Sequence, residues 1–96
     1  MYGMQTFMGI TRRHVFITGK VQGVGFRRSA RSRALELGLT GWGRNLPDRR
    51  VELCFQRRAA DEMENWCRTG SHFSRVTGIS VSLSAQIEDE TGFEIR

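Results

Sequence analysis

Apolar and polar residues alternate in three stretches of this chain, at residues 13–18, 51–56 and 77–85. Successive side chains of a β-strand point to opposite sides, so an apolar residue at every second position is typical of a strand with one buried face. The pattern therefore predicts three strands, and the row of serines in the third suits a face partly open to water.

Two shorter strands are predicted over residues 41–46 and 93–95. The first of them ends at the turn residues Pro47-Asp48. Because only a few residues separate it from the strand at 51–56, we expect the two to pair as an antiparallel hairpin.

Two other stretches have the period of an amphipathic helix. The first begins at Phe26 and ends before Gly38, and its apolar residues recur at spacings of four, four and three. The second is predicted over residues 59–69, with acidic residues near its start and Arg68 near its end, as the helix dipole favours. Its apolar side is formed by Ala59, Met63, Trp66 and Cys67.

The predicted order is βαββαβ with a short terminal strand, which favours an α+β, ferredoxin-like split βαβ fold. Two helices would cover one face of an antiparallel sheet. This domain would span residues 13–96, while residues 1–12 lack any period and are predicted to form a flexible tail.

Composition narrows the class of protein. The 96 residues, 39% of them apolar, suffice for one domain with a modest core. No stretch is long and apolar enough to predict a membrane span or a leader peptide. Cys54 and Cys67 are predicted to lie on different sides of the sheet as free thiols, which favours a reducing, cytoplasmic location.

The net charge of +5, from 15 basic and 10 acidic residues, favours anionic partners such as phosphorylated metabolites or nucleic acid. Charge alone does not choose between them. His14 and His72 are far apart, and no cluster of residues has metal-ligand spacing, so neither a metal nor a cofactor is expected.

A loop with three glycines, Gly19, Gly23 and Gly25, joins the first strand to the first helix. Glycines allow backbone N–H groups to converge, and the start of a helix adds unpaired N–H groups and partial positive charge. Such a loop is suited to phosphate, and Arg27 in the first helical turn adds a guanidinium. A plain tight turn would use the same glycines, so the spacing alone leaves both readings open.

The segment Gly19-Lys20-Val21-Gln22-Gly23-Val24-Gly25-Phe26-Arg27 resembles the signature of the acylphosphatase family. Residues 41–45 resemble the family's second motif, and residues 46–48 and 92–96 also fit it. The resemblance implies that Arg27 binds the substrate phosphate and that Asn45 orients the attacking water. It also implies a phosphate-binding segment made of Lys20, Val21, Gln22, Gly23, Val24, Gly25 and Arg27.

By this resemblance the protein is expected to hydrolyse the carboxyl–phosphate bond of small acyl phosphates without a metal or cofactor. Inorganic phosphate would be its product and inhibitor, no membrane or nucleic acid would be needed, and the protein would be a monomer. The chemistry agrees, because an activated anhydride needs positioning and charge stabilisation more than a strong base. An Asn amide can hold a water by hydrogen bonds.

The chain departs from the family pattern at several positions. Gly43 stands where valine is usual, Arg49 where a turn glycine is common, and Arg28-Ser29 where aromatic residues often follow the signature. The segment 71–75 lacks the proline often found there.

Two other functions compete with this one. The first is a basic nucleic-acid-binding module on the same fold, supported by the charge but opposed by the scarcity of stacking aromatics other than Phe16 on the predicted central strands. The second is a phosphate-binding or carbamoyl-phosphate-handling domain with weak catalysis, of the kind found inside larger proteins.

Overall fold

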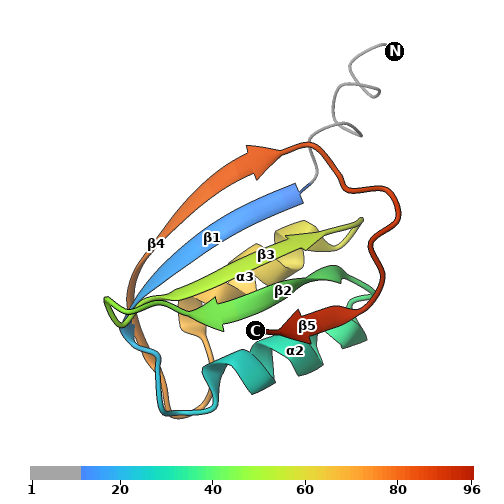
Figure 1. Cartoon of the computed structure of the whole chain (residues 1–96). Helices are drawn as coiled ribbons and strands as arrows, with labels where there is room; N and C mark the ends of the chain where they lie inside the picture. The colour runs from blue at the N-terminus through green and yellow to red at the C-terminus, as the bar shows by residue number, and fades with distance from the viewer. Residues whose placement is uncertain (1–11) are drawn as a thin grey trace.

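The computed structural model describes residues 12–96, which form five strands and two helices (Figure 1). In chain order these are β1 (Arg12–Lys20), α2 (Phe26–Glu36), β2 (Thr40–Asn45), β3 (Val51–Gln56), α3 (Ala60–Thr69), β4 (Arg75–Ser84) and β5 (Phe93–Ile95). Every predicted element is present, with bounds within two residues of those predicted. β1 begins at Arg12, and the rest of the predicted tail, residues 1–11, lies outside the described residues.

The strands form one sheet in the order β4-β1-β3-β2-β5, and both helices cover the same face of it (Figure 1). This confirms the α+β, ferredoxin-like fold. The sheet is antiparallel except at its edge, where β5 runs parallel to β2, with Gly41 opposite Phe93. The predicted antiparallel sheet is thus confirmed for the other strand pairs, and β5 is parallel because the chain crosses one end of the sheet before it enters the far edge.

The core lies between the helices and the helix-facing side of the sheet. Val15 and Ile17 on β1 and Leu53 on β3 are fully buried, as the alternation predicted. They pack with Phe26 of α2 and Met63 of α3. Burial of one such side chain contributes about 1.5–3 kcal/mol, so this layer holds the helices and the loop before α2 against the sheet.

The segment 85–92 crosses the end of the sheet opposite the glycine loop, and polar side chains of β1, β2 and β3 bind it there. The buried Arg12 forms an ion pair with Glu90 at 2.7 Å, and Thr40 donates a hydrogen bond to the same carboxylate at 2.9 Å. Gln56 is bonded to both the N–H and the carbonyl of Ile87. These contacts fix the path by which β5 reaches β2.

The two cysteines lie on different sides of the sheet and are free, as predicted. Cys54 is aligned with His14 and Trp42 on the face without helices, whereas Cys67 is buried on α3. Burial raises the pKa of both thiols, that of Cys67 to about 12. Neither helix in the described part of the chain has the length and apolar character to cross a membrane.

Candidate active site

The glycine loop presents backbone N–H groups at the start of α2. Gly23 and Gly25 both have left-handed backbones, with φ of 74° and 75°, which glycine adopts without the steric cost that a Cβ adds. The hydrogen bond from the N–H of Ser29 to the carbonyl of Gly25 opens the helix, and no side chain caps it. The first N–H groups of the helix therefore have no acceptor within it, and the helix dipole adds positive charge there.

A pocket of about 380 Å³ opens beside this loop. It brings together Gly23, Gly25 and Arg27 from the signature segment and Asn45 from the end of β2, residues separated by about twenty positions in the sequence. Its lining consists of Val21, Gly23, Gly25, Phe26, Arg27, Arg28, Asn45 and Ile95. Five of the predicted site residues thus share one pocket.

Asn45 is the last residue of β2 and pairs with Val51 at the start of β3. Its Oδ1 atom is buried and has no hydrogen-bond partner among residues 12–96. Buried polar atoms in folded proteins are nearly always satisfied, so this oxygen is a candidate acceptor for a water or ligand in the pocket.

The guanidinium of Arg27 lies at the other side of the pocket. Its Nη1 atom donates a hydrogen bond to the backbone oxygen of Arg96 at 3.2 Å. No Asp or Glu side chain among residues 12–96 forms an ion pair with it. The guanidinium is therefore held beside the residue that follows β5, with no side-chain carboxylate to neutralise it.

The side chain of Gln22 connects the loop to the β2–β3 hairpin by hydrogen bonds. Its side-chain Nε2 donates to the carbonyl of Leu46 at 2.8 Å and to that of Arg50 at 2.9 Å. The side chain is thus directed at the hairpin and is absent from the pocket lining, so a direct part in phosphate binding is left to its backbone.

Two other predicted phosphate-binding residues also lie outside the lining. Lys20 is the exposed last residue of β1, opposite Arg75 on β4. Val24 is half-buried and packs against the core. The side chains of these residues support or flank the cradle.

Sequence reasoning missed Phe26, Arg28 and Ile95 as lining residues. Phe26 was predicted only as the first apolar residue of its helix, and Ile95 lies there because β5 pairs with β2. Arg28 directly follows the signature segment, and this position could have indicated that it lies near the pocket.

The β2–β3 hairpin that carries Asn45 has a strained turn. The N–H of Arg49 donates to the carbonyl of Leu46 at 3.1 Å, and Arg49 has a φ of 77°, in the left-handed region that favours glycine. The hydrogen bond from the Arg50 N–H is the chief cause that lowers the pKa of the Asp48 carboxyl in this turn. The departure noted at Arg49 therefore falls where a glycine fits the backbone.

Gly43, two residues before Asn45, is buried beneath the side chain of Leu53. A Cβ at Gly43 would lie 2.6 Å from Leu53 Cδ2, so Leu53 fills the space that a larger residue would occupy.

Among residues 12–96, no three His, Cys, Asp or Glu side chains gather closely enough to hold a metal ion.

An α+β domain of the ferredoxin-like class thus brings unpaired N–H groups at a helix start, the Arg27 guanidinium and a buried amide oxygen to one pocket, an arrangement suited to an anion. The family model described as Acylphosphatase matches residues 13–95. The acylphosphatase of Roseiflexus sp. (strain RS-1) is 47% identical over 90 residues, which cover 92% of this chain and 97% of that protein.

Solved structures agree with this match. The crystal structure of acylphosphatase from Bacillus subtilis superposes with a TM-score of 0.84 at 36% identity, covering 88% of this chain and 97% of that one. The structure of an acylphosphatase from Coxiella burnetii gives 0.79 at 37% identity, covering 92% and 94%. This chain belongs to the acylphosphatase family.

Proposed function

We propose that this chain hydrolyses acyl phosphates in the pocket between the glycine loop and the end of β2. Members of its family are hydrolases that act on acyl phosphates, and the chain is an acylphosphatase. The roles of individual residues given below rest on the geometry of that pocket.

The phosphate group binds where positive charge and N–H groups converge. The backbone of residues 21–25 and the first turn of α2 donate hydrogen bonds to its oxygens. Arg27 adds a planar guanidinium, which binds phosphate in a bidentate way.

Asn45 holds the nucleophile. A water that donates a hydrogen bond to Oδ1 would satisfy this buried atom, which has no partner in the described part of the chain. The water attacks phosphorus, the bond between phosphorus and the acyl oxygen breaks, and its electron pair leaves with the carboxylate. The water's proton passes to a phosphate oxygen of the substrate, giving the carboxylate and dihydrogen phosphate.

This reaction requires no side chain that acts as a base. A carboxylate is a stable leaving group, and asparagine remains neutral near pH 7. Catalysis then comes from orienting the water and stabilising charge on the transferring group, which a preorganised cradle supplies. The same cradle would bind inorganic phosphate, so we propose that phosphate is both product and competitive inhibitor.

The observation that carries this proposal is the unpartnered Asn45 Oδ1 in the same pocket as Arg27. The test is benzoyl phosphate hydrolysis by wild type, Asn45→Ala and the control Asn65→Ala, which removes an exposed amide from α3. Activity should fall only in Asn45→Ala. A folded Asn45→Ala protein with normal turnover would overturn the assignment of Asn45, and an inactive wild type would overturn the function.

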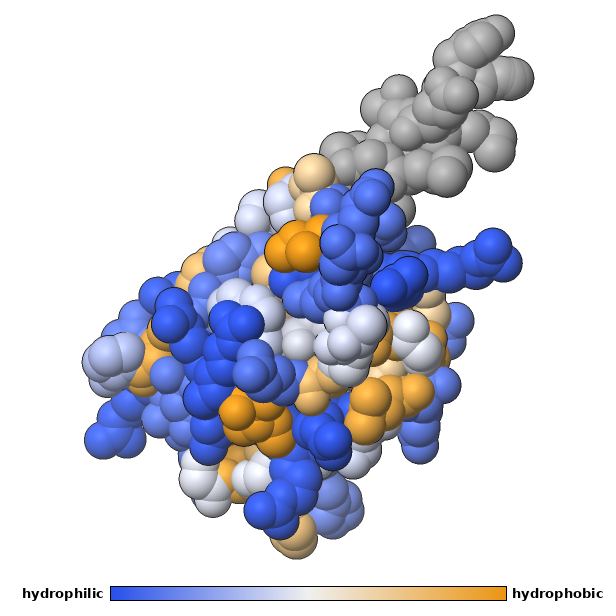
Figure 2. All heavy atoms as spheres, turned by 45° about the vertical axis from the view of Figure 1, so that its right-hand side comes forward, coloured by the Kyte–Doolittle hydropathy of each residue, from blue (hydrophilic) through white to orange (hydrophobic). Residues whose placement is uncertain are grey.

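We also propose a cytoplasmic monomer that works without a metal. Two free cysteines suit a reducing compartment. On the face seen in Figure 2, apolar residues form separate small patches among hydrophilic ones, which suits a surface without a permanent partner.

The nucleic-acid alternative gains no support from the face without helices. Trp42 lies on this face in line with His14, and Arg44 and Arg96 contact its ring. Each of these guanidiniums is neutralised, Arg44 by Glu52 at 2.5 Å and Arg96 by Glu94 at 2.9 Å. Such a face offers a polyanion little unpaired charge.

A further inference from the structure

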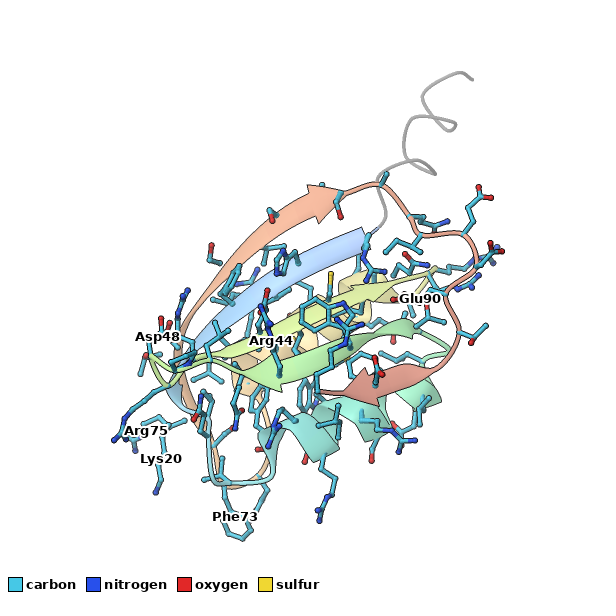
Figure 3. All side chains as sticks on the ribbon, viewed as in Figure 1. Lys20, Arg44, Asp48, Phe73, Arg75 and Glu90 are labelled. Atoms are coloured by element: carbon cyan, nitrogen blue, oxygen red, sulfur yellow. The ribbon has the colours of Figure 1, made fainter. Side chains whose placement is uncertain are left out.

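Lys20 and Arg75 form an unneutralised pair of cations beside the phosphate loop. They are register partners at the ends of β1 and β4, and both are exposed. Figure 3 shows the two side chains extending from the same corner of the sheet. Like charges placed directly opposite each other on neighbouring strands lower stability, so this arrangement calls for a reason.

Seven of the fourteen arginines, all of them among residues 12–96, form ion pairs with acidic side chains. Ion pairs join Arg12 to Glu90, Arg33 to Glu36 and Arg68 to Glu64, among others. Neither Lys20 nor Arg75 has a carboxylate within ion-pairing distance in the described part of the chain. The local positive charge is therefore free for a ligand.

A close approach of the two backbones at Gly19 sets the register of this pair. The register between β1 and β4 shifts at Gly19, which has a φ of 134°. A Cβ there would lie 2.1 Å from the carbonyl oxygen of Arg75, so only glycine allows the two strands to approach this closely. The tight crossing sets Lys20 and Arg75 side by side.

The pair also adjoins the site. Val21, the residue after Lys20, lines the phosphate pocket. Gly70, near the start of the segment that leads to Arg75, packs against Phe26, where a Cβ would lie 2.8 Å from the ring. The exposed Phe73 projects from this segment below the pair (Figure 3). The cations are therefore connected to the pocket on both strands, through Val21 next to Lys20 and through the packing of Gly70 against Phe26.

We propose that Lys20 and Arg75 bind a second anionic group on the acyl part of the substrate, so the enzyme prefers acyl phosphates that carry a carboxylate or phosphate at their far end. This inference rests on the proposed function and names the substrate class of the same site. In this proposal the Lys20 side chain binds the second anionic group of the substrate, whereas the resemblance had implied that Lys20 binds the transferred phosphate.

The test compares hexanoyl phosphate with adipoyl phosphate, which has the same carbon chain but ends in a carboxylate. The measured quantity is the ratio of kcat/KM for adipoyl to that for hexanoyl phosphate, at low and high salt. Arg75→Gln should lower the ratio by about two- to fivefold, the range expected for one exposed ion pair. The control Arg58→Gln removes an equal charge at the opposite end of the sheet and should leave the ratio unchanged.

Charge reversal sharpens the result. Arg75→Glu should lower the ratio further, because its carboxylate repels the second anion, and should raise the melting temperature by pairing with Lys20. High salt should reduce the ratio of wild type toward that of the variants, since screening acts on exposed charges.

Three outcomes separate the possibilities. An unchanged ratio in both Arg75 variants overturns the subsite while leaving the proposed function intact. An equal loss for both substrates also overturns it, because general attraction of anions would then explain the charge. A wild type that hydrolyses neither substrate overturns the proposed function and the subsite together.

Discussion

The side-chain amide of Gln22 donates a hydrogen bond to the carbonyl of Leu46 at 2.8 Å, which ties the phosphate loop to the residue after Asn45. The loop and Asn45 belong to different elements, and this contact fixes their separation. We therefore regard Gln22 as a positioning residue that aligns the bound phosphate with the attacking water.

Replacing Gln22 by Ala should lower kcat by about ten- to a hundredfold, the cost of a small misplacement of reacting groups. Gln22→Glu should lose as much, because a carboxylate cannot donate to the carbonyls of Leu46 and Arg50. Steady-state kinetics and thermal melting of the two variants check this. A purely structural role would instead lower the melting temperature with kcat preserved below it.

Arg49→Gly should stabilise the protein. Arg49 has a φ of 77°, where a side chain costs about 1 kcal/mol or more, partly offset by the greater freedom of glycine in the unfolded chain. The net gain should be about 0.5–1 kcal/mol, or roughly 2–8 °C in melting temperature. Arg49→Lys keeps the backbone strain and should melt like wild type, so an equal shift in both variants would contradict this explanation.

Glu52 should make stability depend on acid pH. Its side chain is 5% exposed, and burial tends to raise its pKa, but hydrogen bonds from Arg44 and His14 outweigh burial and lower it. A carboxyl with a lowered folded pKa stabilises the protein above its ordinary pKa, near 4.3, and loses that contribution as pH falls through the lowered value.

Unfolding of Glu52→Gln at a series of pH values tests this relation. The variant should be about 1–3 kcal/mol less stable at neutral pH and should lose less stability than wild type below about pH 4. Glu94→Gln removes a more exposed carboxylate and should behave like wild type. Parallel acid profiles for wild type and Glu52→Gln would show that Glu52 does not carry the dependence.

Inorganic phosphate should inhibit competitively, and chelators should have no effect. The cradle supplies N–H groups and the Arg27 charge without a metal. Phosphate titration should shift the amide NMR signals of residues 21–25, and EDTA should leave kcat/KM unchanged. Activity that is lost with EDTA and restored by a divalent ion would refute this mechanism.

Much of the fold follows from the sequence because local patterns determine it. The alternation around Val15 and Leu53 identified the central strands, and both residues are fully buried. The parallel entry of β5 escaped prediction because it depends on the path of residues 85–92, which is fixed by long-range contacts such as that between Arg12 and Glu90.

The site divides in the same way. The glycine loop and Arg27 are adjacent in sequence, and their common pocket was predicted from spacing and resemblance. Three other features of the site depend on residues that are distant in the sequence. They are the hydrogen bonds of Gln22 to the hairpin, the pairing of Lys20 with Arg75, and the position of Ile95 in the pocket lining. Local sequence patterns do not predict such long-range contacts.

The last prediction concerns the division of work between Arg27 and Asn45, which face the same pocket from α2 and β2. Arg27 should contact phosphate in the ground state and in the transition state. Its replacement by Ala should therefore raise both KM and the phosphate inhibition constant, and lower kcat. Arg27→Lys should rescue little, because an ammonium cannot reproduce the planar, bidentate fork.

Asn45 should act mainly in the transition state, because it contacts the water and leaves the bound phosphate to the cradle. Asn45→Ala should lower kcat on the order of a hundredfold or more, while KM and the phosphate inhibition constant stay near those of wild type. The competing role, a strand-end contact between β2 and β3, predicts a less stable protein with nearly normal turnover. Measuring kcat, phosphate inhibition and melting temperature on the same sample decides between them, since only the catalytic role separates a large loss of kcat from unchanged phosphate binding.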